Sequence, residues 1–176
     1  MDAEFITARL NLCAVLPNLQ RLPELDPESA QMIDDWDQTI QFIVRRGPAA
    51  YVSFSDGGCT YGQGKHSSPT IKLFFLSPKH ANKMFAGKGI PIPLKGFTKL
   101  GFLTRKFEKL TKRLEAFLKP AEGEKKDDAF QKTSVTLILE TGLRAVRELA
   151  TYEPTCKKVA AHTPKGSLEV TALPDG

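Results

Sequence analysis

Apolar and polar side chains alternate through much of residues 39–76. Apolar residues recur at every second position in two runs, namely Ile40, Phe42 and Val44, then Ala50, Val52 and Phe54. This repeat is typical of a β-strand with one buried face. Gly47-Pro48 separates the two runs, and Asp56-Gly57, a strong signal for a tight hairpin, follows the second. The pattern therefore predicts four strands joined as an antiparallel meander, at 39–45, 49–55, 59–64 and 70–76.

Helix caps follow the fourth predicted strand. Ser77-Pro78 supplies an N-cap and a proline for the first helical position, so a helix should cover 78–86. Two prolines within 88–96 remove backbone donors, which predicts an extended loop there. We interpret 97–103 as the fifth strand. Residues 105–118 carry an apolar stripe at helical spacing with lysines opposite, which predicts an amphipathic helix.

Helices are also expected before the strands. Residues 3–16 have apolar side chains at helical spacing. Asp26-Pro27-Glu28 is a typical start for a second helix, which should carry Met32, Ile33 and Trp36. The fold expected from these elements is α+β, with a five-stranded, mostly antiparallel sheet and helices covering one face.

The last 57 residues are expected to extend this domain. We place the domain at 1–119, a charged linker at 120–128 and an extension at 129–176. A helix is predicted at 129–150 and a final strand at 167–173. The apolar face expected for this helix comprises Val135, Ile138, Leu139, Val146 and Leu149, and Leu137 and Leu143 widen it. The extension either begins a second repeat of a longer chain or pairs with a sheet edge, in its own subunit or across a homodimer.

Positive charge is concentrated in one part of the chain. Residues 79–119 hold eleven Lys and Arg against two Glu, a net charge of +9. This segment is expected to attract an anionic headgroup, a membrane surface or a phosphorylated ligand, unless it is simply a solvated face. No nucleic-acid-binding signature accompanies it. The residues expected to contact the anion are Lys83, Lys88, Lys95, Lys99, Arg105 and Lys106.

The chain lacks the patterns of several other protein classes. It has no apolar run near the roughly 20 residues of a membrane-spanning helix and no apolar signal segment at its start. Three cysteines without short spacing suit a reducing compartment, so a cytoplasmic location is expected. The three histidines have no metal-ligand spacing, and no catalytic triad or cofactor fingerprint is present. We therefore expect a binding protein with no catalytic residues, metal or cofactor, and not an enzyme.

The order of these elements from about residue 36 to residue 118 resembles the sterol carrier protein type two family. The matching stretches are the hairpin 40–54 with its Gly47-Pro48 turn, Asp56-Gly57, residues 69–74, residues 84–88 ending in Gly87-Lys88, and residues 99–102. Two features depart from the family. Thr104-Arg105 stands where a Gly-Asp or Gly-Asn is usual, and 88–96 is richer in proline.

The resemblance implies a sheet covered by helices around a lipid-sized apolar cavity. The implied function is non-catalytic binding or transfer of a fatty acyl or sterol-like ligand. Two alternatives remain: a structural or protein-interaction domain without a lipid, and an accessory domain of a lipid-metabolising enzyme. The apolar positions that strand alternation and helix faces place around such a cavity are Ile71, Leu73, Phe75, Met84, Phe85, Leu94, Phe107 and Leu110.

Overall fold

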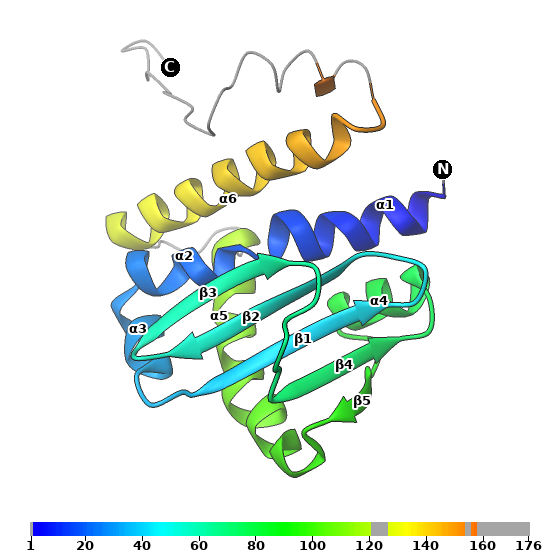
Figure 1. Cartoon of the computed structure of the whole chain (residues 1–176). Helices are drawn as coiled ribbons and strands as arrows, with labels where there is room; N and C mark the ends of the chain where they lie inside the picture. Colours follow the sequence, from blue (N-terminus) through cyan, green and yellow to red (C-terminus); the bar gives the residue numbers. More distant parts are fainter. Residues whose placement is uncertain (1, 121–126, 154–155, 158–176) are drawn as a thin grey trace.

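Five strands form one mixed sheet in the computed structural model, which describes residues 2–120, 127–153 and 156–157. Along the sheet the strands lie in the order β3-β2-β1-β4-β5 (Figure 1). The strands are β1 (Gln38–Val44), β2 (Ala49–Ser55), β3 (Gly58–Gln63), β4 (Ile71–Phe75) and β5 (Ile92–Lys95). The expected α+β class and the five-stranded sheet are confirmed.

The first three strands form the predicted antiparallel hairpins. Ile40 lies beside Val52 in the first pair, and Val52 lies beside Tyr61 in the second. Asp56 and Gly57 have φ angles of 51° and 70°. Both central positions of the β2–β3 turn are therefore left-handed, as a primed hairpin turn requires.

The meander prediction is wrong after β3, because the chain crosses over and places β4 parallel to β1. Ile71 lies beside Ile40, and Leu73 lies beside Phe42. Side-chain hydrogen bonds hold the connection in place. Buried Gln41 donates through Nε2 to the Gly64 carbonyl over 3.0 Å and accepts from the His66 N–H. The sheet is therefore mixed rather than mostly antiparallel.

The predicted fifth strand at 97–103 is also wrong. These residues begin a helical segment, with a 3₁₀ turn η2 (Phe97–Lys99) and a π-helix η3 (Phe102–Phe107). The fifth strand is β5, within the segment expected to be a loop. Prolines are tolerated there because β5 lies at the sheet edge, where one side needs no hydrogen-bond donors. Gly96, with a φ of 84°, ends the strand.

Helices cover one face of the sheet (Figure 1).

The predicted helix caps at Asp26 and Ser77 are confirmed, because Asp26 accepts from the Ser29 N–H and Ser77 accepts from the His80 N–H. The first predicted helix ends before Pro17 as expected, with its second part π-helical, and a further helix that the sequence analysis does not include follows it. Besides η2 and η3, the helices are α1 (Ala3–Leu10), the π-helix η1 (Asn11–Val15), α2 (Asn18–Leu25), α3 (Pro27–Ile33), α4 (Pro78–Phe85), α5 (Glu108–Leu118) and α6 (Asp128–Leu149).

The core lies between the sheet and these helices. Alternate residues of β1, β2 and β4 point into it, where they meet apolar residues of η1, α2, α3 and α5. Within the described ranges, no helix has the length and apolarity needed to cross a bilayer. The largest fully buried side chains are Phe42, Phe54, Phe75, Phe117, Leu12, Leu19, Leu22, Ile33, Ile40, Ile71, Leu110 and Leu137.

Helix α6 packs against the same core through the Leu137 side of the predicted apolar face, not through the centre of that face. Leu137 is fully buried, and the Phe130 ring stacks on Phe117 with 4.4 Å between centroids. Ser134 Oγ donates to the Phe117 carbonyl. By contrast, the predicted face exposes its central residues Val135, Ile138 and Leu139. The strand expected at 167–173 lies outside the described residues.

Candidate functional site

The predicted cavity-wall residues fall into three groups in the structure. Ile71, Leu73 and Phe75 of β4 point into the core and are buried, as is Leu110 of α5. Three others, Met84, Phe85 and Phe107, are half-buried and pack against the core from α4 and η3. The eighth, Leu94, is 52% exposed on the edge strand β5 and does not face this interior.

Aromatic packing occupies the space next to Phe107. Its ring centroid lies 6.4 Å from that of Phe42 and 6.2 Å from that of Phe54. These distances are within the range of favourable aromatic pairs. The predicted wall residue Phe107 therefore packs against rings of β1 and β2, and two hollows of the described chain lie elsewhere.

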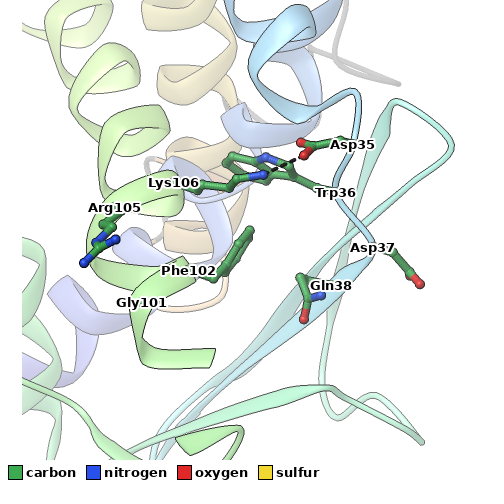
Figure 2. Close-up of a pocket in the computed structure, with 8 residues that line it drawn as sticks. All are labelled: Asp35, Trp36, Asp37, Gln38, Gly101, Phe102, Arg105 and Lys106. Carbon is green, nitrogen blue, oxygen red and sulfur yellow. Dashed lines mark hydrogen bonds and ion pairs between the residues drawn. The ribbon is translucent and has the colours of Figure 1, made fainter. Parts of the chain in front are cut away.

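The first hollow lies between η3 and the segment that leads into β1. Its volume is about 350 Å³. Figure 2 shows Trp36 and Phe102 at its centre, with Lys106 beside Trp36, whereas Arg105 and Asp37 point outward. The lining residues are Asp35, Trp36, Asp37, Gln38, Gly101, Phe102, Arg105 and Lys106.

Aromatic rings form the floor of this hollow. Trp36 meets both Phe54 and Phe102 edge to face, with 4.9 Å between centroids in each pair. Trp36 is only 4% exposed, and its Nε1–H has no hydrogen-bond partner. Among the described residues, it is the sole buried side-chain nitrogen or oxygen in that condition. A buried donor without a partner costs about 1–3 kcal/mol.

Polar groups form the rim of the hollow. Lys106 Nζ contacts Asp35 Oδ2 at 2.7 Å, and Lys99 Nζ donates to Gln38 Oε1 at 2.6 Å. The hydrogen bond from Lys106 lowers the pKa of Asp35. The hollow therefore combines an apolar floor with a charged rim, and the buried, unpartnered Nε1–H belongs to one of its lining residues, Trp36.

The second hollow is polar and is built around structural hydrogen bonds. It has a volume of about 400 Å³ between η1, β3 and α6. On its lining, Tyr61 donates to the Leu12 carbonyl at 3.0 Å, and Arg9 pairs with Glu148 at 2.6 Å. Burial raises the pKa of Cys13, which keeps its thiol protonated at neutral pH. These partners favour a structural role for this region.

The other residues with potential chemistry are engaged in local structure. His80 accepts from the Leu76 N–H through Nδ1, and its Nε2 contacts the Ile90 carbonyl. The His66 ring packs on Tyr51. Burial raises the pKa of Cys59 to about 12, so this thiol stays protonated. Among the described residues, no group of three His, Cys, Asp or Glu side chains could hold a metal ion.

The six predicted anion-contacting residues remain near solvent. Lys83, Lys88, Lys95, Arg105 and Lys106 are exposed, while Lys99 is half-buried. Two of them have partners: Lys106 contacts Asp35, and Lys99 donates to Gln38. The structure therefore spreads these cations from α4 along β5 to η3 rather than gathering them into one binding cleft.

The sequence interpretation missed the Trp36–Phe102 hollow because it placed both residues in the wrong elements. The sequence pattern predicts a strand for Phe102 and places Trp36 in the helix that starts at Pro27. The spacing of Leu100, Leu103 and Phe107, three and four residues apart, is the helical signal that could have located Phe102 correctly. Comparison with known protein families and with curated proteins found no match for this chain.

Proposed function

We propose that the protein is a non-catalytic lipid-binding protein that shelters a fatty acyl or sterol-like ligand. The ligand would enter at the hollow between Trp36 and Phe102 and extend toward the covered face of the sheet. The aromatic floor with an unpartnered donor is the observation that carries this proposal. The resemblance to the sterol carrier protein type two family supports the same ligand class.

The chemistry of the hollow suits an apolar molecule with one oxygen-bearing end. Trp36 and Phe102 offer apolar surface, and the Trp36 Nε1–H can donate to a hydroxyl, carbonyl or carboxylate oxygen. Binding would then recover the hydrogen bond that the buried indole lacks. The volume of about 350 Å³ is near the lower end of small-molecule pockets. A long chain therefore requires η3 to move outward.

The η3 segment is built in a way that permits such movement. A π-helix is rare, and its occurrence in proteins is frequently associated with functional sites. No residue of η3 is fully buried, and its apolar side chains Phe102, Leu103 and Phe107 are half-buried against the core. Outward displacement of η3 would let a chain pass between Phe107 and the buried strands while leaving α5 in place.

Fluorescence of Trp36 provides a direct test, because it is the single tryptophan of the chain. Titration with oleate or with a sterol should shift or quench its emission in a saturable way. Solvent extraction of the purified protein should also release an acyl lipid or a sterol. If extraction yields no lipid and neither oleate nor the sterol changes Trp36 emission, the proposal fails and an interaction domain without a lipid becomes the better interpretation.

A matched pair of variants locates the ligand. Phe102→Ala removes part of the aromatic floor and should weaken binding of a fluorescent acyl probe at least about tenfold. Leu100→Ala shortens an exposed side chain two residues away that does not line the hollow, and should leave binding unchanged. Equal affinity in Phe102→Ala and the unmodified protein would place the ligand elsewhere.

A further inference from the structure

Large apolar side chains are exposed along one edge of the sheet. Nine such residues are exposed in the described chain, and six of them lie within 76–100, on β5 and its flanks. Ile90 is 85% exposed and Phe97 is 61% exposed. We call this surface the β5 edge, defined by Leu76, Ile90, Ile92, Leu94, Phe97 and Leu100.

The β5 edge continues onto the sheet face that the helices leave uncovered. Ile43 lies beside Phe74, and Phe74 lies beside Ile92, in three neighbouring strands. Phe74 alternates with the buried Leu73 and Phe75, so this row lies on the side opposite the core. Ile43 and Phe74 are half-buried, so the row joins the exposed β5 edge to partly exposed apolar surface. A contiguous apolar surface of this kind marks an interaction site.

The charge around the β5 edge has one sign. Residues 57–107 contain nine Lys and Arg and no Asp or Glu. Lys83, Lys88 and Lys95 are exposed on α4, in the connection to β5 and on β5 itself. A partner that covers this surface must therefore be anionic as well as able to accept apolar side chains.

Addition of a strand from a second copy of the chain fits this edge poorly. Pro91 and Pro93 lack the N–H groups with which a pairing strand would form hydrogen bonds. A second copy would also bring the same positive charge against this one. Both arguments favour a partner that needs no backbone pairing.

We propose that the β5 edge docks onto an anionic lipid surface. Ile90, Leu94 and Phe97 enter the interfacial layer of the bilayer, and Lys88 and Lys95 contact the phosphate groups of the lipids. Lysine suits this position because its stem can lie in the apolar layer while its ammonium stays among the headgroups. None of these five residues lines the Trp36–Phe102 hollow, so the inference is independent of the proposed lipid-binding function.

Vesicle flotation with two matched triple variants tests the docking. Vesicles of phosphatidylcholine alone are compared with vesicles of equal parts phosphatidylcholine and phosphatidylglycerol. The variant Ile90→Ser/Leu94→Ser/Phe97→Ser should bind the anionic vesicles at least about tenfold more weakly than the unmodified protein. The control Val135→Ser/Ile138→Ser/Leu139→Ser removes the three other exposed apolar side chains, on α6 and remote from β5 (Figure 1), and should bind normally.

A separate variant tests whether the lysines of the β5 edge are needed for binding to anionic vesicles. Lys88→Glu/Lys95→Glu should lose most binding to the anionic vesicles and most of the salt dependence of that binding. Fluorescent acyl-probe binding by the soluble protein should persist in both β5-edge variants, which separates this surface from the proposed ligand site. Docking is overturned if the unmodified protein does not bind anionic vesicles, or if the apolar β5-edge variant binds as well as the α6 control.

Insertion is measured separately, so that misfolding of a triple variant cannot obscure the result. In Phe97→Trp the added indole should be quenched by brominated phospholipids in the anionic vesicles. The unmodified protein serves as the control, because it lacks the added indole and shows how much quenching comes from Trp36 alone. Binding without added quenching in Phe97→Trp would show that this edge stays outside the bilayer and would overturn the proposal.

Discussion

Arg113 of α5 donates two parallel hydrogen bonds to the Asp26 carboxylate, from Nε to Oδ2 at 2.5 Å and from Nη2 to Oδ1 at 2.8 Å. The same carboxylate caps α3 by accepting from the Ser29 N–H at 3.0 Å. One side chain therefore starts α3 and attaches α5 to it. Burial raises the pKa of Asp26, but the hydrogen bonds from Arg113 and Ser29 outweigh this effect, and the pKa is lowered.

Loss of the Asp26 carboxylate should destabilise the fold. Asp26→Ala removes both the cap and the partner of a partly buried guanidinium, and we expect a loss of about 2–3 kcal/mol in the free energy of unfolding. Urea denaturation measures this change. The control is Glu108→Gln, which breaks the exposed Glu108–Lys112 pair and should cost less than about 0.5 kcal/mol. Equal effects of the two variants would contradict a special role for Asp26.

The same carboxylate should make stability depend on acid pH. Because the pKa of Asp26 is lower in the folded than in the unfolded protein, its charge stabilises the fold fully above the unfolded value of about 4. That contribution is lost as the pH falls through the folded pKa. Asp26→Asn should therefore be less stable than the unmodified protein at pH 7, and the difference should shrink below pH ~4. A difference that stays constant or grows in acid would refute this assignment.

Local signals in the sequence were sufficient to predict the caps and turns that form between residues close together in the chain. The caps at Asp26 and Ser77 and the left-handed turn at Asp56-Gly57 depend on residues that are adjacent or nearly so, and all are confirmed. The crossover to β4 depends on distant partners. The Thr70 N–H donates to the Thr39 carbonyl at 3.0 Å. A contact between residues this far apart in the chain cannot be predicted from a repeat of apolar residues.

The errors in the fold and in the candidate site share a cause. Prolines in 88–96 excluded a central strand but not an edge strand, and moving the fifth strand to 97–103 removed Phe102 from the helical segment. Leu94 was consequently expected inside and lies at the surface. On α6 the apolar pattern includes the buried Leu137 but leaves out Thr133 and Ser134. Their hydroxyls donate to backbone carbonyls, which allows this partly polar side of the helix to be buried.

Truncation at the predicted cavity wall should affect both stability and ligand binding. Phe107→Ala removes a ring that packs between Phe42 and Phe54, and should cost about 2–3 kcal/mol. It should also change the affinity for a fluorescent acyl probe, as should Phe85→Ala. Phe97→Ala, at an exposed phenylalanine, is the control and should cost less than about 0.5 kcal/mol. Unchanged probe binding in both Phe85→Ala and Phe107→Ala would exclude them from the ligand site.

The three cysteines should differ in reactivity. Burial raises the pKa of Cys13 and of Cys59, the latter to about 12, and encloses both side chains. Only the thiolate reacts with disulfide reagents, so both should remain unmodified in the native protein at pH 8. Cys156 is partly exposed and should react first. Peptide mass spectrometry after brief and denaturing treatments identifies the sites, and early modification of Cys59 would contradict its buried position.

Two adjacent residues of α6 can establish which side of this helix faces the core. Leu137, at the margin of the predicted apolar face, is fully buried, whereas Ile138, at its centre, is 42% exposed. Leu137→Ala leaves a cavity in the core and should cost about 2–4 kcal/mol, while Ile138→Ala should cost less than about 1 kcal/mol. Both changes preserve helix propensity because alanine is the best helix former. Thermal or urea unfolding of the two variants measures the difference. If Ile138→Ala is the more harmful change, α6 packs through the centre of the predicted face rather than through its Leu137 side, and this orientation of the helix is wrong.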